Sequence, residues 1–163
     1  MSEPVFIQTS DRYSMTCCVR MAIFAPQEVI WWVLTDAQGF SQWNSTVERI
    51  DGDIREGERL GLRVPGVERV FTPRVSQVQA PRRMVWSDGL RFVFRGVRRF
   101  ELRPLDDGAI EFSMQERFSG VVFALLRKTM PDFQPIFEAY ARDLCRESER
   151  VNERMASRSS RTA

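Results

Sequence analysis

The last part of the chain contains the pattern that most constrains the fold, a long run of apolar residues at helical spacing. Between positions 133 and 153, apolar side chains recur every three or four residues, with charged side chains between them. This spacing predicts a long amphipathic helix that ends near Glu153. The residues expected on its apolar face are Phe133, Ile136, Phe137, Tyr140, Leu144 and Val151. Those expected on the solvent face are Glu138, Arg142, Asp143, Arg146, Glu149 and Arg150.

The segments before this helix alternate between apolar and polar residues, which is typical of strands with one buried face. The expected strands are 13–24, 47–53, 59–64, 67–79, 83–87, 91–102 and 109–119, with a turn at Asp88-Gly89. Two short helices are expected after the first strand, one beginning at Pro26 and one around 40–44, and a third at 121–128. This order predicts an α+β fold in which the C-terminal helix covers one antiparallel sheet.

Length and composition indicate one globular domain. The chain has 163 residues, of which 43% are hydrophobic and 28% charged. We expect residues 1–12 to be a flexible N-terminus, 13–153 to form the domain and 154–163 to be a disordered basic tail. The tail carries three arginines and no acidic residue, and the net charge of the whole chain is only +2. We therefore expect the tail to act as a solubilising end.

The chain contains no histidine, which excludes Ser–His–Asp and Cys–His catalysis, histidine-ligated metals and histidine general bases. Its three cysteines, Cys17, Cys18 and Cys145, lack C-x-x-C spacing, and an odd count argues against a disulfide framework. We expect them to be thiols in a reducing compartment. No phosphate-loop, dinucleotide-binding or metal-ligand spacing is present, so we predict no metal and no cofactor.

Targeting signals are not expected. The first residues lack the basic start and apolar run of a signal peptide. No apolar stretch approaches the roughly 20 residues that span a bilayer. These features predict a cytoplasmic protein without integral membrane association.

Several short motifs, taken together, carry a resemblance to a known family. They are Ala25-Pro26-Gln27-Glu28-Val29 with Trp32, Leu34-Thr35-Asp36, Trp43-Asn44, the Gly52 and Gly57 pair, Gly96 with Phe100 and Leu102, Glu116-Arg117-Phe118-Ser119-Gly120, and Met130-Pro131-Asp132-Phe133 with Phe137. Over about residues 13–153 the chain resembles the START-like, or SRPBCC, superfamily, and most of all its polyketide cyclase/dehydrase and lipid-transport branch. The resemblance implies the helix-grip fold, a curved seven-stranded antiparallel sheet around the C-terminal helix. It also implies an apolar cavity between them that accepts hydrophobic ligands.

The turn at 106–108 allows the register of the last two strands to be predicted. If Leu105 faces Ala109, the pairs on one face are Leu102 with Phe112, Phe100 with Met114, Arg98 with Glu116, and Gly96 with Phe118. We expect Phe92 and Phe94 to continue this inner face. The face expected in solvent carries Arg91, Arg95, Arg99, Arg103, Glu111, Ser113, Gln115 and Arg117. Valines rather than aromatic residues separate its first three arginines, so no nucleic-acid binding is expected.

An otherwise apolar inner face is thus predicted to carry one arginine opposite one carboxylate. Arg98 and Glu116 are either a structural ion pair that fixes the register, or a polar anchor in which Arg98 holds an anionic oxygen of a ligand. The resemblance implies that close relatives often carry histidine at the positions of Arg98 and Met114. Histidine-dependent chemistry of such relatives is therefore not expected here.

The residues predicted to line the ligand site are Trp43, Phe71, Met84, Trp86, Phe92, Phe94, Arg98, Phe100, Phe112, Met114, Glu116, Phe133, Phe137 and Tyr140. For the aromatic and sulfur-containing members, packing in the core is the alternative. If the protein is an enzyme, Glu116 or Tyr140 would move a proton and Arg98 would stabilise an oxyanion.

These features lead to one main hypothesis and two alternatives. The main hypothesis is a protein that binds a small hydrophobic ligand, neutral or anionic and lipid- or polyketide-like, in an internal cavity. The first alternative is a cyclase or dehydratase-type enzyme, working without histidine on a polyketide-like substrate. The second is a co-chaperone-like module that interacts through its surface. A monomer and a homodimer are both compatible with the sequence.

Overall fold

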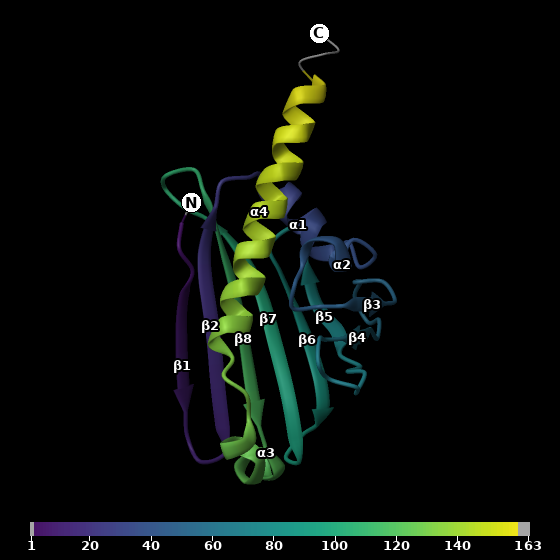
Figure 1. The fold of residues 1–163 in the computed structure, drawn as a ribbon, viewed down its shortest axis with the longest axis vertical. Coiled ribbons are helices and arrows are strands. Elements are labelled where there is room, and N and C mark those ends of the chain that lie inside the picture. The colour runs from purple at the N-terminus through teal and green to yellow at the C-terminus, as the bar shows by residue number, and fades with distance from the viewer. Residues whose placement is uncertain (1, 160–163) are drawn as a thin grey trace.

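A computed structural model describes residues 2–159 (Figure 1). The strands are β1 (Val5–Ser10), β2 (Ser14–Ile23), β3 (Arg49–Asp51), β4 (Gly61–Arg63), β5 (Arg74–Gln79), β6 (Arg83–Leu90), β7 (Phe94–Pro104) and β8 (Ile110–Ser119). The helices are α1 (Gln27–Thr35), α2 (Phe40–Trp43), α3 (Val121–Leu126), the 3-10 turn η1 (Arg127–Thr129) and α4 (Gln134–Ser159).

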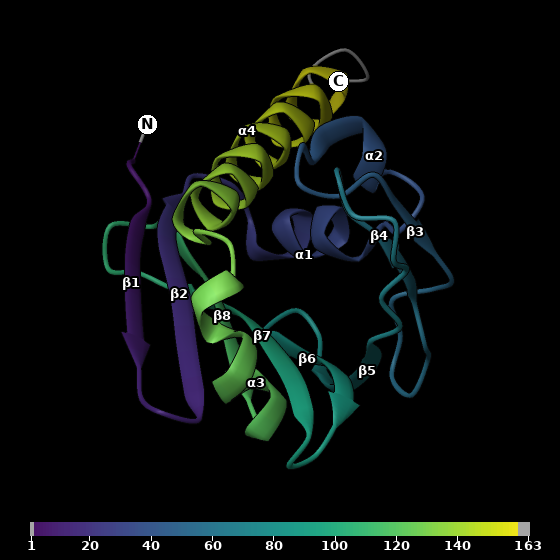
Figure 2. The same cartoon turned by 60° about the horizontal axis from the view of Figure 1, so that its bottom comes forward.

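Six of these strands form one antiparallel sheet in the order β1-β2-β8-β7-β6-β5. The sheet curves around α4 and α1, which lie over the same face (Figure 2). Strands β3 and β4 form a separate two-stranded sheet. Two isolated bridges connect this part of the chain to β5 and the segment before it: Leu62 of β4 is paired with Phe71, and Arg59, just before β4, with Arg74 at the start of β5. The α+β helix-grip architecture is therefore as predicted, with eight strands in two sheets rather than seven in one.

The N-terminal residues differ from the prediction of a flexible end. Strand β1 pairs with β2 from Val5 opposite Arg20 to Ser10 opposite Met15. Most of its side chains are exposed, although the Phe6 ring packs edge-on against Phe137 with centroids 5.8 Å apart. Backbone hydrogen bonds to β2 hold this edge strand, so its side chains need not show a strong apolar alternation.

The C-terminal helix is longer than predicted. Helix α4 continues to Ser159, so the prediction of a disordered tail is wrong for residues 154–159. Residues 160–163 of that predicted tail lie outside the described residues. None of the helices in the described part of the chain combines the length and the apolar composition needed to cross a bilayer.

The turn between β6 and β7 also differs from the prediction. Gly89 is paired with Arg95 inside the ladder, and a Cβ at this position would collide with the carbonyl oxygen of Phe94. Asp88 and Gly89 therefore lie within β6, and the glycine is required because β7 approaches closely there. The predicted turn at Asp88-Gly89 is wrong, since the chain reverses after Leu90. Phe92 lies in that turn with a φ of 69° and its side chain is exposed. The prediction that Phe92 lies on the inner face is wrong.

Candidate functional site

The predicted register of β7 and β8 is confirmed. Leu102 is paired with Phe112, Phe100 with Met114, and Arg98 with Glu116. Nε and Nη2 of Arg98 donate hydrogen bonds of 3.0 and 2.6 Å to Oε2 of Glu116. Because both bonds end on one carboxylate oxygen, Oε1 of Glu116 and Nη1 of Arg98 are not used within the pair. They are therefore the atoms of the pair best suited to contact another molecule.

The ion pair belongs to a row of polar residues across the sheet. Trp86 on β6 is paired with Arg98, Arg98 with Glu116, and Glu116 with Cys17 on β2. We call Trp86, Arg98, Glu116 and Cys17 the polar row. The row on one side of it contains Met84, Phe100, Met114 and Val19, and the row on the other contains Gly96, Phe118 and Met15. On β7, β8 and β2 the sheet thus places the polar row between two rows without charge, and Asp88 on β6 is the charged member of the second row.

Gly96 leaves space beside the free carboxylate oxygen. A Cβ built at this position would lie 3.5 Å from Oε1 of Glu116, and its other nearest neighbours are ring atoms of Phe118. Any side chain larger than alanine would therefore extend over the ion pair. The glycine keeps the carboxylate accessible from this side.

Helix α4 covers the polar row with aromatic side chains. The Phe137 ring lies 5.7 Å from Cζ of Arg98, within the range of a cation–π contact. Tyr140, one turn further, is stacked on Phe112 with centroids 6.2 Å apart. Phe133, the residue just before α4, stacks on Phe118 with ring centroids 4.9 Å apart. Aromatic rings therefore lie around the Arg98–Glu116 pair on the inner face.

Three buried donors near this site have no hydrogen-bond partner among residues 2–159: Nε1 of Trp43, Nε1 of Trp86 and the hydroxyl of Tyr140. They come from α2, β6 and α4, yet their rings form one connected group. Ring centroids are 6.0 Å apart for Trp43 and Tyr140, and Phe100 contacts both Tyr140 at 6.1 Å and Trp86 at 4.9 Å. Buried polar groups normally have partners, because leaving one unpaired costs free energy. Three such groups together make this part of the core the candidate functional site.

The buried surroundings determine which groups carry charge. Burial raises the pKa of Tyr140 well above its usual value, with only partial opposition from the charge of Arg98. Burial disfavours the charge of Arg98, but Glu116 outweighs this through its charge and its hydrogen bond, and the pKa of Arg98 is raised. Burial, with the nearby Glu116, raises the pKa of Cys17 to about 12. Around neutral pH the site therefore offers a phenol, a guanidinium and an un-ionised thiol.

The other residues predicted for the site fall into a core group and two separate residues, Phe71 and Phe92. The group packs in the same core as the polar row, either fully or partly buried: Met84, Phe94, Phe100, Phe112, Met114, Phe133 and Phe137. Phe71 also packs against the core, but from the segment joined to β4, with Arg69 over its ring at 5.4 Å. Phe92 is the exposed turn residue described above. Apart from Phe92, the predicted set is thus a core surrounding the polar row, with Phe71 at its margin.

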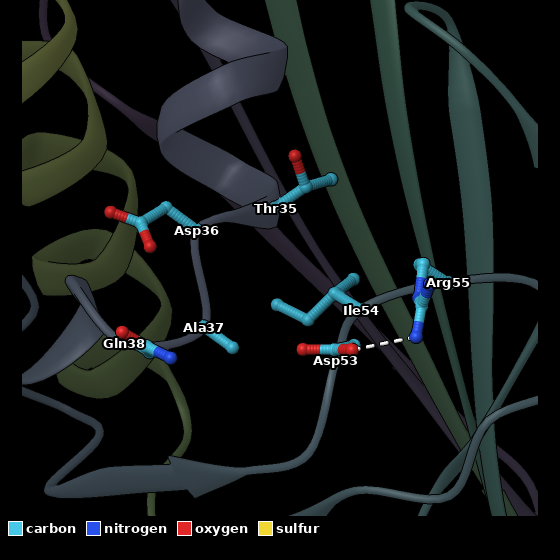
Figure 3. Close-up of a pocket in the computed structure, with 7 residues that line it drawn as sticks. All are labelled: Thr35, Asp36, Ala37, Gln38, Asp53, Ile54 and Arg55. Carbon is cyan, nitrogen blue, oxygen red and sulfur yellow. Dashed lines mark hydrogen bonds and ion pairs between the residues drawn. The ribbon is translucent and has the colours of Figure 1, made fainter.

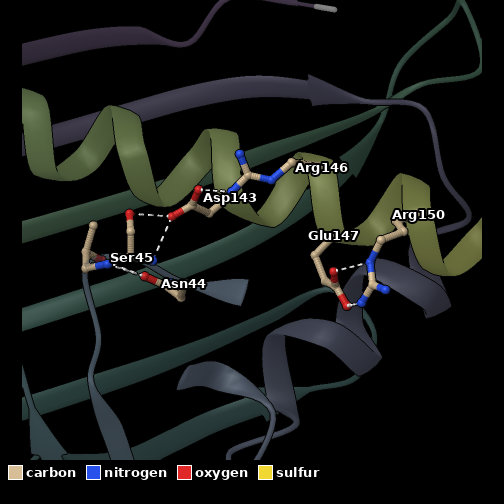
Figure 4. A network of polar contacts seen from close by, with 7 residues as sticks. Asn44, Ser45, Asp143, Arg146, Glu147 and Arg150 are labelled. Carbon is tan, nitrogen blue, oxygen red and sulfur yellow. Dashed lines mark hydrogen bonds and ion pairs between the residues drawn. The ribbon is translucent and has the colours of Figure 1, made fainter. Parts of the chain in front are cut away.

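A second polar network was not predicted. Asp143 was expected on the solvent face of the helix, but it is buried. Its Oδ2 accepts hydrogen bonds from the backbone nitrogen and Oγ of Ser45, at 2.8 and 2.6 Å, and its Oδ1 accepts one from Arg146 (Figure 4). This network ties α4 to the residues that follow α2, and so holds Trp43 over the site. The sequence contains no local signal for it, because the partners are far apart in the chain.

Two pockets open elsewhere on the surface. One, of about 410 Å³, lies between the end of α1 and the segment after β3 and is lined by Thr35, Asp36, Ala37, Gln38, Asp53, Ile54 and Arg55 (Figure 3). The other, of about 290 Å³, lies on the outer face of the sheet and is lined by Arg20, Glu101, Arg103, Glu111 and Ser113. Neither contains a residue of the polar row. The only ion pair of the first pocket, Arg55 with Asp53, is exposed and contributes little stability.

Comparison with known proteins agrees with this architecture. A family model described as polyketide cyclase / dehydrase and lipid transport matches residues 16–149. No curated protein matches the chain. Among solved structures, a Rhodobacter sphaeroides protein is 17% identical with a TM-score of 0.67, over 91% of this chain and 99% of that one.

Two further solved structures are similar over most of the chain. The Zhui aromatase/cyclase from Streptomyces sp. R1128 is 15% identical with a TM-score of 0.66, over 85% of this chain and 95% of that one. CalU16 from Micromonospora echinospora is 14% identical with a TM-score of 0.58, over 94% of this chain and 92% of that one. At such identities the similarity shows a shared fold.

Proposed function

Since the chain belongs to the polyketide cyclase / dehydrase and lipid transport family, we propose that it binds a small apolar ligand with an oxygen-bearing end. The polar row holds that end, and the aromatic core holds the apolar body. One observation carries the proposal. Three buried donors without partners in the described chain, on Trp43, Trp86 and Tyr140, lie in one group of rings next to the Arg98–Glu116 pair.

The chemistry of these groups favours an acceptor-rich ligand. Indole nitrogens, a phenol and a guanidinium all donate hydrogen bonds, and Glu116 is the one group among them that only accepts. A carboxylate, an enol or a ketone oxygen would satisfy the unpaired donors, whereas an ammonium group, which has no lone pair, would not. An arginine in an apolar environment favours the anionic form of such a ligand. The free thiols Cys17, Cys18 and Cys145 support a site of action in a reducing compartment such as the cytoplasm.

The test compares charged and uncharged probes. Anthraquinone-2-carboxylate and dodecanoate, each with its uncharged amide, are titrated into the protein while tryptophan fluorescence is followed. In Arg98→Gln, affinity for the carboxylates should fall about tenfold more than affinity for the amides, because a charge-assisted hydrogen bond is lost. Native mass spectrometry of the purified protein then shows whether it retains an apolar molecule.

Arg103→Gln is the matched control, because Arg103 also pairs with a glutamate of β8 but on the outer face. It should bind all four probes like the unaltered protein. Gly96→Leu should weaken both carboxylate and amide, since its side chain would cover the pair. Equal losses for carboxylate and amide in Arg98→Gln, or no binding of any probe, would contradict the proposal.

A cyclase or dehydratase activity at the same residues is the second candidate, and the buried Tyr140 hydroxyl, which has no partner in the described chain, favours it. A protonated phenol beside a guanidinium can polarise a ketone oxygen and donate a proton to it. Glu116 is less suited to act as a base, because Arg98 already occupies one of its oxygens twice. If a polyketide-like substrate is turned over, Tyr140→Phe should lower kcat by about 100-fold, well beyond the loss of affinity that follows from the missing hydrogen bond. Binding without turnover assigns the protein to ligand binding.

A further inference from the structure

The most exposed large apolar side chains of residues 2–159 gather at one end of the molecule. They are Leu125, Phe92 and Leu90, with 81%, 75% and 70% of their surface exposed. Leu125 lies on α3, Phe92 in the turn between β6 and β7, and Leu90 at the end of β6. Figure 1 shows α3 at the lower end of the sheet, where the β1–β2 and β6–β7 turns also lie. Scattered apolar residues on a surface are ordinary, but a cluster of the most exposed ones points to an interaction.

Backbone hydrogen bonds hold these segments together as one surface. Val121 and Val122 donate to the carbonyl oxygens of Phe92 and Val93, at 3.0 and 2.9 Å. Gly120 donates to the carbonyl oxygen of Tyr13 at 3.1 Å, which adds the β1–β2 turn. A Cβ at Gly120 would collide with the carbonyl of Val93, so the close approach requires glycine. We call residues 12–13, 90–93 and 120–128 the tip.

The tip is strongly basic, although the whole chain is nearly neutral. It carries Arg12, Arg91, Arg127 and Lys128 and no acidic residue, whereas the net charge of the chain is +2. Arg91 lies over the ring of Phe92 at 5.1 Å, and Arg12 over Tyr13 at 5.4 Å. The adjacent Asp11 is engaged in its own turn, where it accepts bonds from the backbone nitrogens of Tyr13 and Ser14.

We propose that the tip docks the protein on an anionic membrane surface. Leu90, Phe92 and Leu125 enter the interface between headgroups and acyl chains, and the four basic side chains contact lipid phosphates. These apolar side chains come from a strand end, a turn and a short helix and are each at least 70% exposed, which suits insertion into lipid. A two-fold pairing of tips would bring eight positive charges together, so a second copy of the chain is a poor occupant.

This surface is separate from the polar row, and the inference does not depend on the ligand proposed above. Membrane docking by a few side chains also requires no spanning helix. Helix α1 provides a matched control, because its Trp32 is an exposed apolar side chain and the helix lies in the upper part of Figure 1, away from α3.

The test is co-sedimentation with vesicles of phosphatidylcholine alone and of phosphatidylcholine mixed with phosphatidylglycerol. The protein should bind the mixed vesicles, and high salt should weaken this binding. Phe92→Ser and Leu125→Ser should each weaken it about tenfold. Arg91→Gln combined with Arg127→Gln should weaken it about 25-fold, at about fivefold for each charge. Trp32→Ser should bind like the unaltered protein, and circular dichroism should show that all variants are folded.

Several outcomes would overturn the inference. They are no binding to the mixed vesicles, equal binding to both kinds of vesicle, or binding that the tip variants leave unchanged. A dimer that Leu125→Ser dissociates would assign the tip to a second copy of the chain instead. Arg98→Gln should bind vesicles normally, so failure of the ligand proposal and failure of this one are distinguishable.

Discussion

Strands β7 and β8 carry two arginine–glutamate pairs that differ mainly in the face on which they lie. Arg98–Glu116 is on the inner face, with side chains 19% and 14% exposed and a shortest nitrogen–oxygen distance of 2.6 Å. Arg103–Glu111 is on the outer face, with 69% and 22% exposed and a distance of 3.1 Å. The same two residue types are thus directly opposed in the same ladder in both cases.

The difference between the pairs is one of solvation. On the outer face, water already stabilises both charges, so the pair contributes about 0–1 kcal/mol. On the inner face, each charge depends on the other, and removal of one partner leaves the other poorly solvated. A charge pair in an apolar setting is also where a ligand gains most from a polar contact. The inner pair is therefore the one to which the proposed ligand contact is assigned.

The largest expected effect is on stability. Glu116→Gln should lower the free energy of unfolding by about 3 kcal/mol, the lower end for a buried pair because both side chains keep some contact with solvent. Glu111→Gln should lower it by less than about 1 kcal/mol. Urea denaturation followed by circular dichroism measures both values. Arg98→Met combined with Glu116→Met should recover most of the loss, and equal losses in the two single variants would mean that the faces do not differ.

The position of the inner pair was predictable because it depends on local geometry. The turn at 106–108 sets the register of β7 and β8, and alternation along both strands then assigns every side chain to a face. The β6–β7 turn was not predictable in the same way. Gly89 is needed for a close approach to Phe94, but in the sequence it has the form of a hairpin turn. The consequence was the wrong placement of Phe92.

Interactions between segments that are far apart in the chain could not be predicted either, because they depend on how the segments pack together. Asp143 has charged neighbours and a position on the helix that suit solvent, and only the arrival of Ser45 makes its burial favourable. The three unpaired donors are likewise a property of the packed core, since each of Trp43, Trp86 and Tyr140 is an ordinary core residue in the sequence. Sequence patterns give the faces of elements, whereas the partners of buried polar groups require the tertiary structure.

The next largest effect is on the pH dependence of stability, and it compares two adjacent cysteines on opposite faces of β2, Cys17 and Cys18. Burial, reinforced by Glu116, raises the pKa of Cys17 from 9.0 to about 12, so its thiol ionises in the unfolded chain before it ionises in the folded protein. Stability should therefore be fully present below pH 9 and decline between pH 9 and about 12, by at most about 1.4 kcal/mol per pH unit for this group. Denaturation at a series of alkaline pH values measures the slope. Cys17→Ala should reduce it and Cys18→Ala should not, and identical slopes in the two variants would contradict the assigned burial.

The smallest expected effect concerns the two tyrosines, of which one is buried and the other exposed. The Tyr140 hydroxyl is buried without a partner in the described chain, whereas Tyr13 is exposed. Removing a buried, unpaired hydroxyl removes a desolvation cost, so Tyr140→Phe should raise the free energy of unfolding by about 1 kcal/mol, and Tyr13→Phe should leave it unchanged. Denaturation without a ligand and probe titration of the same samples together test this prediction. If the hydroxyl is reserved for a ligand, Tyr140→Phe gains stability and loses affinity at the same time. A loss of stability would mean instead that the hydroxyl is satisfied inside the folded protein and has no need of a ligand.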